Sequence, residues 1–179
     1  LPLETAVARA VSEPLGLSRT GYRPASDADV VATEICAWRG RRVRAEVHDE
    51  NAARLGGVSG HAGLFSTATD VARLGQSFLD GSLLRTETVA EMAREQARDG
   101  DVRRGLGFQL WSPDPEASSH PFSPRTFGHT GFTGTSLWID PERSLVVALL
   151  TNRVYHGRAL AGILRLRVDL HQAIVAAVS

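Results

Sequence analysis

The spacing of apolar residues predicts two helices in the first half of the chain. Over residues 3–13 the apolar positions recur every three or four residues, and a proline and a glycine then end the pattern. Thr67 and Asp70 form a helix-capping pattern ahead of a second apolar stripe, which ends at Gly81. Between these helices, residues 17–55 show no clear period, so we expect a long, partly structured excursion there.

The same reading predicts two more helices, with a strand and a loop between them. A helix is expected over residues 86–98 and a strand over residues 106–111. The prolines and serines of residues 112–124 predict a surface loop. A last helix should begin near residue 159. Its expected buried stripe consists of Ile163, Leu166, Leu170 and Ile174.

Two further segments predict strands of an antiparallel sheet. One runs over residues 126–139 and the other over residues 145–151, and a type I turn at Asp-Pro-Glu-Arg joins them. The run LVVALL is apolar at every position, which predicts a strand covered on both faces. Helices, then antiparallel strands, then a final helix together predict an α+β fold.

The stretch FGHTGFTGTSLWID, residues 127–140, places glycines where a strand should begin. Gly131 and Gly134 would let a ligand approach the backbone, and the neighbouring N–H groups could then donate to an oxyanion. Thr130 and Thr133 supply hydroxyl groups, and His129 can exchange a proton near neutral pH. These residues form a candidate acyl-transfer wall. A bulged edge strand with a surface histidine is the alternative that the residues alone leave open.

Composition narrows the chemistry further. The chain has 179 residues, and its formal net charge of zero gives no indication of nucleic-acid binding. All 20 basic residues are arginine, so lysine chemistry is excluded within this chain. Cys36 is the single cysteine, which excludes an intrachain disulfide and predicts a buried thiol.

Four segments, in order, carry a resemblance to a known family. His-Thr-Gly at 129–131, followed by a hairpin strand and LLTN, resembles the third motif of the serine β-lactamase and penicillin-binding-protein superfamily. The likeness is greatest to the class C β-lactamase-like branch, which includes DD-peptidases, D-aminopeptidases and esterases. PLGL at 14–17, HDENA at 48–52 and GHAGLFSTATDVARL at 60–74 are similar to other segments of that family. The resemblance implies a β-lactamase/transpeptidase-like α+β fold.

The resemblance also implies roles for the residues of the third motif. His129 would help the catalytic network and meet a substrate carboxylate, and Thr130 would contact the substrate. The backbone N–H of Phe132 would be one oxyanion donor, while the second donor would come from the nucleophile itself.

Four more residues would contact the substrate. Gly131 would keep the strand open and Thr133 would offer its hydroxyl. His61 and Ala62 fall where the family's loop borders the acyl pocket. No metal or other cofactor is implied.

The first two motifs of the family are missing. Its Ser-x-x-Lys nucleophile motif cannot occur without lysine, and neither Tyr22 nor Tyr155 is followed two places later by Asn. We therefore expect residues 1–179 to be the C-terminal part of one β-lactamase-like hydrolase domain, inactive alone. Its expected partners are the N-terminal half of that domain and a small-molecule or peptide substrate with an acyl carbonyl. No nucleic acid is expected, and exposed sheet surface predicts dimerisation. The resemblance is compatible with an extracytoplasmic or secreted protein.

Three other readings remain open. An α/β-hydrolase is disfavoured because GVSGH at 57–61 does not complete Gly-x-Ser-x-Gly. A metal site at His48, Asp49 and His61 would lack any of the usual ligand spacings. A non-catalytic module that recognises cell-wall peptides would share the fold but lack a nucleophile upstream.

Residues outside these motifs carry simpler expectations. Asn152 is expected to be structural and Arg158 to be solvated. The remaining histidines are expected on loops or on a helix surface: His120, His156 and His171.

Overall fold

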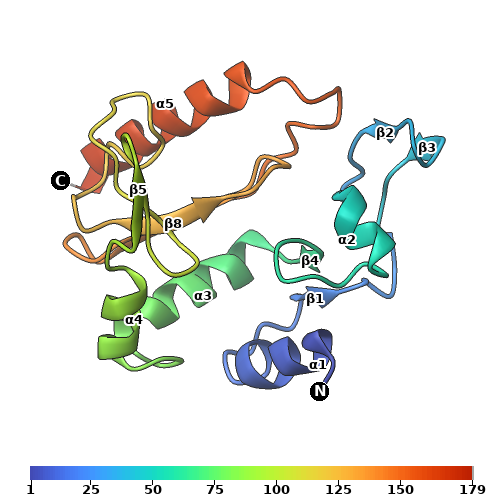
Figure 1. The fold of residues 1–179 in the computed structure, drawn as a ribbon, viewed down its shortest axis with the longest axis horizontal. Helices are drawn as coiled ribbons and strands as arrows, with labels where there is room; N and C mark the ends of the chain where they lie inside the picture. Colours follow the sequence, from blue (N-terminus) through green and yellow to red (C-terminus); the bar gives the residue numbers. More distant parts are fainter. Residues whose placement is uncertain (179) are drawn as a thin grey trace.

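A six-stranded antiparallel sheet with helices on both faces forms the larger part of the computed structural model, which describes residues 1–178 (Figure 1). The first helix, α1, continues as one turn of π-helix. The elements are, in order, α1 (Leu3–Val7), the π-helical turn (Ala8–Ser12), β1 (Gly21–Tyr22), β2 (Ile35–Cys36), β3 (Arg41–Arg42), α2 (Glu50–Arg54), β4 (Leu64–Phe65), α3 (Ala68–Asp80), α4 (Thr86–Met92), β5 (Ala97–Asp99), β6 (Val102–Arg104), β7 (Gln109–Leu110), β8 (Phe127–Thr130), β9 (Ser136–Asp140), β10 (Leu145–Leu149) and α5 (Ala161–Val178).

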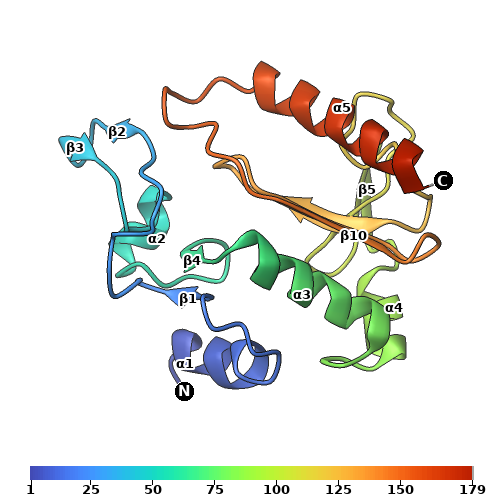
Figure 2. The same cartoon turned by 180° about the vertical axis from the view of Figure 1, so that it is seen from behind.

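The sheet has the order β10-β9-β8-β7-β6-β5, so β10 and β5 are its edges. All its neighbouring strands are antiparallel, and Thr130 at the end of β8 lies opposite Ser136 at the start of β9. Helix α5 covers one face, and α3 with α4 lies on the other (Figure 2). The α+β fold class expected from the order of elements is confirmed.

The expected single strand over residues 126–139 is wrong, because it is a hairpin of β8 and β9. The backbone N–H of Gly131 donates to the carbonyl of Thr135 at 2.7 Å, which closes the turn. Gly134 has a φ of +111°, a conformation that residues with a side chain rarely adopt. The glycines therefore form a tight turn rather than the start of a strand.

Two apolar clusters pack against the sheet. Phe127 and Ile139 belong to a cluster that includes residues of α3 and α4. Trp138 and Val147 belong to a second cluster with Phe122 and with partly buried residues of α5. Neighbouring positions along β9 thus face opposite sides of the sheet, as the period of a strand requires. The residues of β10 are buried or half-buried, which agrees with the expected cover on both faces.

Helix α3 confirms the capping pattern. The Thr67 side chain accepts a hydrogen bond from the Asp70 backbone N–H, and Gly81 ends the helix in a left-handed conformation. The helix expected over residues 86–98 ends early, because α4 stops at Met92 and the chain turns back as β5. The strand expected over 106–111 is also shorter, since β7 covers only two residues.

Helix α5 buries part of the expected stripe, since Ile163 is buried and Ile174 packs against the cluster of Trp138 and Val147. Leu166 is exposed, whereas Arg167 and His171 are buried beside Ile163 and Val168. The buried positions still recur every three to four residues, but the stripe is rotated because it includes two polar residues. The surface location expected for His171 is therefore wrong.

The loop over residues 112–124 is not wholly on the surface either. Ser119, Phe122 and Ser123 are buried. The backbone carbonyl of Ser118 lies 2.8 Å from Nδ1 of His171, which ties the loop to α5.

Residues 17–55 form the irregular excursion that the sequence predicts, with only short elements. This segment docks on the chain that follows β10, where the Asn152 side-chain amide donates to the Ala32 carbonyl at 2.5 Å. The structural role expected for Asn152 is thereby supported. Cys36 is a buried, free thiol, as expected. Within residues 1–178, no helix combines the length and apolar character needed to cross a membrane.

Candidate functional site

The turn over residues 131–135 is held by a hydrogen bond to every one of its carbonyl groups. The Gly131 carbonyl accepts from the Gly134 N–H at 3.1 Å, and the Thr135 carbonyl accepts from the Gly131 N–H. The Gly134 carbonyl accepts from the Thr151 hydroxyl at 2.7 Å. The remaining two carbonyls, of residues 132 and 133, accept from the side chain and backbone of Arg153 respectively. A turn anchored in this way has little freedom to rearrange.

Two consecutive backbone N–H groups of this turn remain available. In the described part of the chain, the N–H groups of Phe132 and Thr133 have no acceptor, although every carbonyl around them is bonded. The Phe132 residue is 55% exposed. A pre-organised N–H group of this kind can donate to an oxygen that becomes negatively charged during a reaction.

His129 stands immediately before the turn, and its contacts assign its tautomer. Its Nδ1 lies 2.8 Å from the Thr130 carbonyl, which can only accept, so Nδ1 carries the proton. Its Nε2 lies 3.2 Å from an Arg104 guanidinium nitrogen, which can only donate, so Nε2 is the acceptor. The Thr130 hydroxyl donates to the Gln109 side chain at 3.3 Å. In this arrangement Nδ1 of His129 is the donor, and Nε2 lies beside the Arg104 cation as an acceptor.

Three side chains surround the Phe132 ring. The His48 imidazole stacks on it with centroids 5.7 Å apart. The guanidinium carbons of Arg153 and Arg158 lie 4.4 and 5.6 Å from the ring centroid. These contacts join the turn to the segment around His48, more than 80 positions earlier in the sequence, and to the chain after β10.

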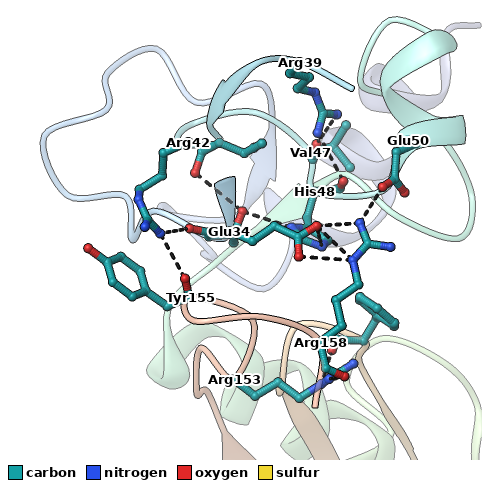
Figure 3. Close-up of polar contacts among 12 residues, drawn as sticks. Glu34, Arg39, Arg42, Val47, His48, Glu50, Arg153, Tyr155 and Arg158 are labelled. Atoms are coloured by element: carbon teal, nitrogen blue, oxygen red, sulfur yellow. Dashed lines mark hydrogen bonds and ion pairs between the residues drawn. The ribbon is translucent and has the colours of Figure 1, made fainter. Parts of the chain in front are cut away.

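Arg158 also bridges two carboxylates, those of Glu34 and Glu50 (Figure 3). It donates to Glu34 through Nε at 2.9 Å and to Glu50 through Nη2 at 2.5 Å. These hydrogen bonds hold the pKa of both carboxyl groups below their ordinary values and raise the pKa of Arg158. Arg158 is exposed, as expected of a solvated arginine, but its guanidinium group also donates to these two carboxylates, which the sequence did not predict.

His48 is buried within the same network (Figure 3). Its Nδ1 lies 2.9 Å from the Thr33 hydroxyl, and its Nε2 lies 3.7 Å from Glu34. Burial lowers the pKa of His48 and outweighs the opposing effect of Glu34. The imidazole is therefore neutral at pH 7 and serves as a packing surface for Phe132.

Among residues 1–178, the side chain of His61 forms no hydrogen bond with the turn over residues 131–135. Its Nε2 lies 3.0 Å from Asp49, whose side chain also caps α2, and its Nδ1 lies 2.7 Å from the Ser59 hydroxyl. Ala62 lies next to it and is half-buried. The metal-site alternative would need Asp49, His61 and His48 to converge, but His48 faces Glu34 instead. Residues 1–178 hold no group of three or more His, Cys, Asp and Glu with metal-binding geometry.

Among residues 1–178, the hydrogen bonds of the His61 ring go to Ser59 and Asp49 and not to residues 129–133. Sequence reasoning missed the residues that anchor the turn. Two of them, Thr151 and Arg153, follow LVVALL directly, so the end of that strand was an available signal. Glu34 had no such signal, since its partner Arg158 is 124 positions away.

Comparison with known proteins agrees with this architecture. Residues 1–171 match the family model described as β-lactamase. A protein of Salmonella agona (strain SL483), provisionally named D-alanyl-D-alanine carboxypeptidase, is 36% identical over 180 residues. The alignment covers 86% of this chain and 40% of that protein, and a Salmonella typhi protein of the same name matches equally. The chain therefore spans about 40% of the length of these curated relatives.

Solved structures show the same fold. A β-lactamase from Mycobacterium bovis superposes with a TM-score of 0.68 at 22% identity, covering 99% of this chain and 57% of that one. A mutant simvastatin synthase from Aspergillus terreus gives 0.72 at 19% identity, with coverage of 99% and 50%. A penicillin-binding-protein homologue from Caulobacter crescentus gives 0.64 at 22% identity, with coverage of 97% and 52%. With the family model matching residues 1–171, these findings show that the chain belongs to the β-lactamase family.

Proposed function

We propose that this chain supplies one wall of the acyl-transfer site of a serine hydrolase of the β-lactamase and DD-peptidase type. The observation that carries the proposal is the anchored turn after His129, whose Phe132 N–H has no acceptor among residues 1–178. Membership of the family and the name of the 36% identical relatives favour this chemistry. Among the possible substrates, that name favours a peptide ending in D-alanine.

In the proposed reaction, a serine hydroxyl outside this chain attacks the acyl carbonyl while a base takes its proton. The carbonyl oxygen becomes an oxyanion, which the Phe132 N–H and the N–H of the nucleophile stabilise. The intermediate expels the protonated leaving group, and water then attacks the acyl-enzyme and releases the acid. Phe132 and Thr130 thus act on the acyl group, and His129 joins the proton network.

The substrate contacts of this wall come from the same turn. Arg104, whose guanidinium group lies beside His129, would hold a substrate carboxylate, because Arg158 is already bound to Glu34 and Glu50. Gly131 leaves room for the substrate and Thr133 offers a hydroxyl group. His61 and Ala62 belong to this proposal only as a more distant border of the acyl pocket.

The N-terminal part of the same domain would complete the site and cover β10. This strand is an edge of the sheet. A groove of about 730 Å³ runs along it between α3 and α5, lined mostly by apolar residues of β10 and α3. An unpaired strand edge of this kind favours pairing with another segment, so dimerisation of the isolated chain is the alternative outcome.

Covalent labelling tests the proposal. We define the extended protein as this chain continued upstream to the start of its reading frame. Both forms are treated with a fluorescent penicillin and with an activated ester, and intact mass is measured. The proposal expects acylation of the extended protein only. Acylation of the isolated 179-residue chain would mean that it holds its own nucleophile. No acylation of either form by any acyl donor would favour the non-catalytic binding module.

A further inference from the structure

Arg167 on α5 is a buried cation that donates hydrogen bonds to two carbonyl groups of the turn over residues 131–135. The residue is 5% exposed. Its Nη2 donates to the Thr135 carbonyl at 2.7 Å and to the Gly131 carbonyl at 3.3 Å. The final helix therefore contacts the turn at the carbonyl groups of its first and last residues.

The charge of Arg167 has no counter-ion among residues 1–178. Arg158 and Arg143, by contrast, each form ion pairs with carboxylates, at Glu34 and Asp140 respectively. The Nε of Arg167 is also buried without an acceptor in the described structure. Burial, and to a smaller extent the charge of Arg153, lowers the pKa of Arg167. A buried, uncompensated cation destabilises a fold, so its presence calls for a reason other than stability.

The carbonyl groups of the turn do not need Arg167 as a hydrogen-bond donor. Without Arg167, the Gly131 carbonyl would keep the Gly134 N–H as its donor, and the Thr135 carbonyl would keep the Gly131 N–H. Neither carbonyl would become an orphan. What the arginine adds is a positive charge and a second hydrogen bond to each carbonyl.

One of these carbonyls, that of Gly131, belongs to the peptide group that carries the proposed oxyanion donor. The C=O of Gly131 and the N–H of Phe132 are the two ends of a single peptide unit. A cation bound to the oxygen draws electron density toward it and makes the N–H at the other end a stronger donor.

We propose that Arg167 is a positioning residue that holds and polarises the Gly131–Phe132 peptide, so that the Phe132 N–H binds the reaction's oxyanion more strongly. This inference rests on the proposed function. It assigns the missing negative partner of Arg167 to the oxyanion, which exists only while the reaction proceeds.

The test compares three variants of the extended protein. Arg167→Met removes the charge at similar length, Arg167→Lys keeps the charge without the guanidinium fork, and Arg165→Met is a control on the same helix. The control side chain is 85% exposed, and within residues 1–178 its ion pair is with Asp169. Acylation rate constant, KM, thermal midpoint and the amide resonance of Phe132 are measured for each.

Arg167→Met should lower the acylation rate constant by about tenfold or more with little change in KM, because the donor acts on the oxyanion and not on the bound substrate. Its thermal midpoint should stay equal or rise, since a buried unpaired charge has been removed. Arg167→Lys should recover part of the rate, and Arg165→Met should match the wild type. The Phe132 amide resonances should move upfield in Arg167→Met only.

Acylation that is unchanged in Arg167→Met would overturn the inference. A rate loss accompanied by a lower thermal midpoint, and not recovered by lysine, would also overturn it, because the arginine would then be merely structural. Failure of the wild type to be acylated would refute the proposed function and the catalytic part of this inference together. The Phe132 resonance reports separately, and an unmoved resonance refutes the polarisation whatever the activity.

Discussion

Replacing Gly134 by alanine should destabilise the protein through two effects that the structure separates. The φ of +111° would be strained for alanine, at a cost of about 1–3 kcal/mol. The added Cβ would lie 2.4 Å from the Thr151 hydroxyl oxygen and 3.1 Å from the Arg153 backbone nitrogen. Displacing Thr151 breaks its hydrogen bond to the Gly134 carbonyl, a further loss of about 1 kcal/mol. With partial relaxation, we expect a total of about 2–4 kcal/mol.

Gly157→Ala is the matched control. Gly157 has a φ of +130°, but no atom lies within 4 Å of the position of an added Cβ. This variant therefore carries the backbone strain without the clash. The assay is urea unfolding of each variant, followed by far-ultraviolet circular dichroism at one temperature.

Gly134→Ala should lose more stability than Gly157→Ala, by about 1–2 kcal/mol. For a chain of this size that difference corresponds to about 2–8 °C in thermal midpoint. Equal losses in the two variants would show that the turn yields to the added methyl group. The hydrogen bonds around residues 131–135 would then not hold the turn in one conformation.

Three other predictions concern His129, two buried histidines and the buried stripe of α5. His129→Ala in the extended protein should reduce turnover by about 10²-fold if the residue joins proton transfer, and unchanged turnover would remove it from the mechanism. Burial lowers the pKa of His48 and His171 from 6.5, so their contribution to stability is present above that pH and lost as the pH falls. The thermal midpoint of the wild type should therefore drop as the pH falls from about 7.5 to about 5.5, and it should drop less when either residue is replaced by glutamine. The same pH dependence in the wild type and the variants would contradict this. Ile163→Asp should prevent stable folding, whereas Leu166→Asp should leave the circular dichroism spectrum unchanged. The opposite result would show that Leu166 is buried, as the sequence predicts.

Local patterns in the sequence were sufficient for the elements that local interactions define. The cap at Thr67 and the end of α3 at Gly81 follow from hydrogen bonds within a few residues, and the structure has both. The order of helices and strands likewise gave the fold class. The hairpin of β8 and β9 was missed because Gly131 and Gly134 were assigned to a ligand, whereas they first allow the chain to reverse direction.

Tertiary contacts explain the other differences. The stripe on α5 was partly misplaced because an apolar criterion cannot anticipate that Arg167 and His171 are buried while Leu166 is exposed. Each polar side chain is held by backbone carbonyls from a distant segment, which periodicity does not reveal. The network of Glu34 and Arg158 was hidden for the same reason.

For the candidate site, the motif residues around His129 were accessible from the sequence, but their support was not. Resemblance to the family pointed to Phe132 as a donor. The bonded carbonyls around it, and the stacked His48, became visible only in three dimensions. The catalytic roles of these residues stay predictions until activity is measured.

The most direct measurement of the central claim is the amide resonance of Phe132 in the extended protein, recorded with and without a boronic acid. A boronic acid forms a tetrahedral, negatively charged adduct with a nucleophilic serine and so imitates the oxyanion intermediate. We expect the Phe132 amide proton to move downfield on adduct formation, while the N–H of Gly100, in the turn between β5 and β6 at the edge of the sheet away from β10, does not. A covalent serine adduct that leaves the Phe132 resonance unmoved would contradict the account, because the oxyanion would then be held elsewhere.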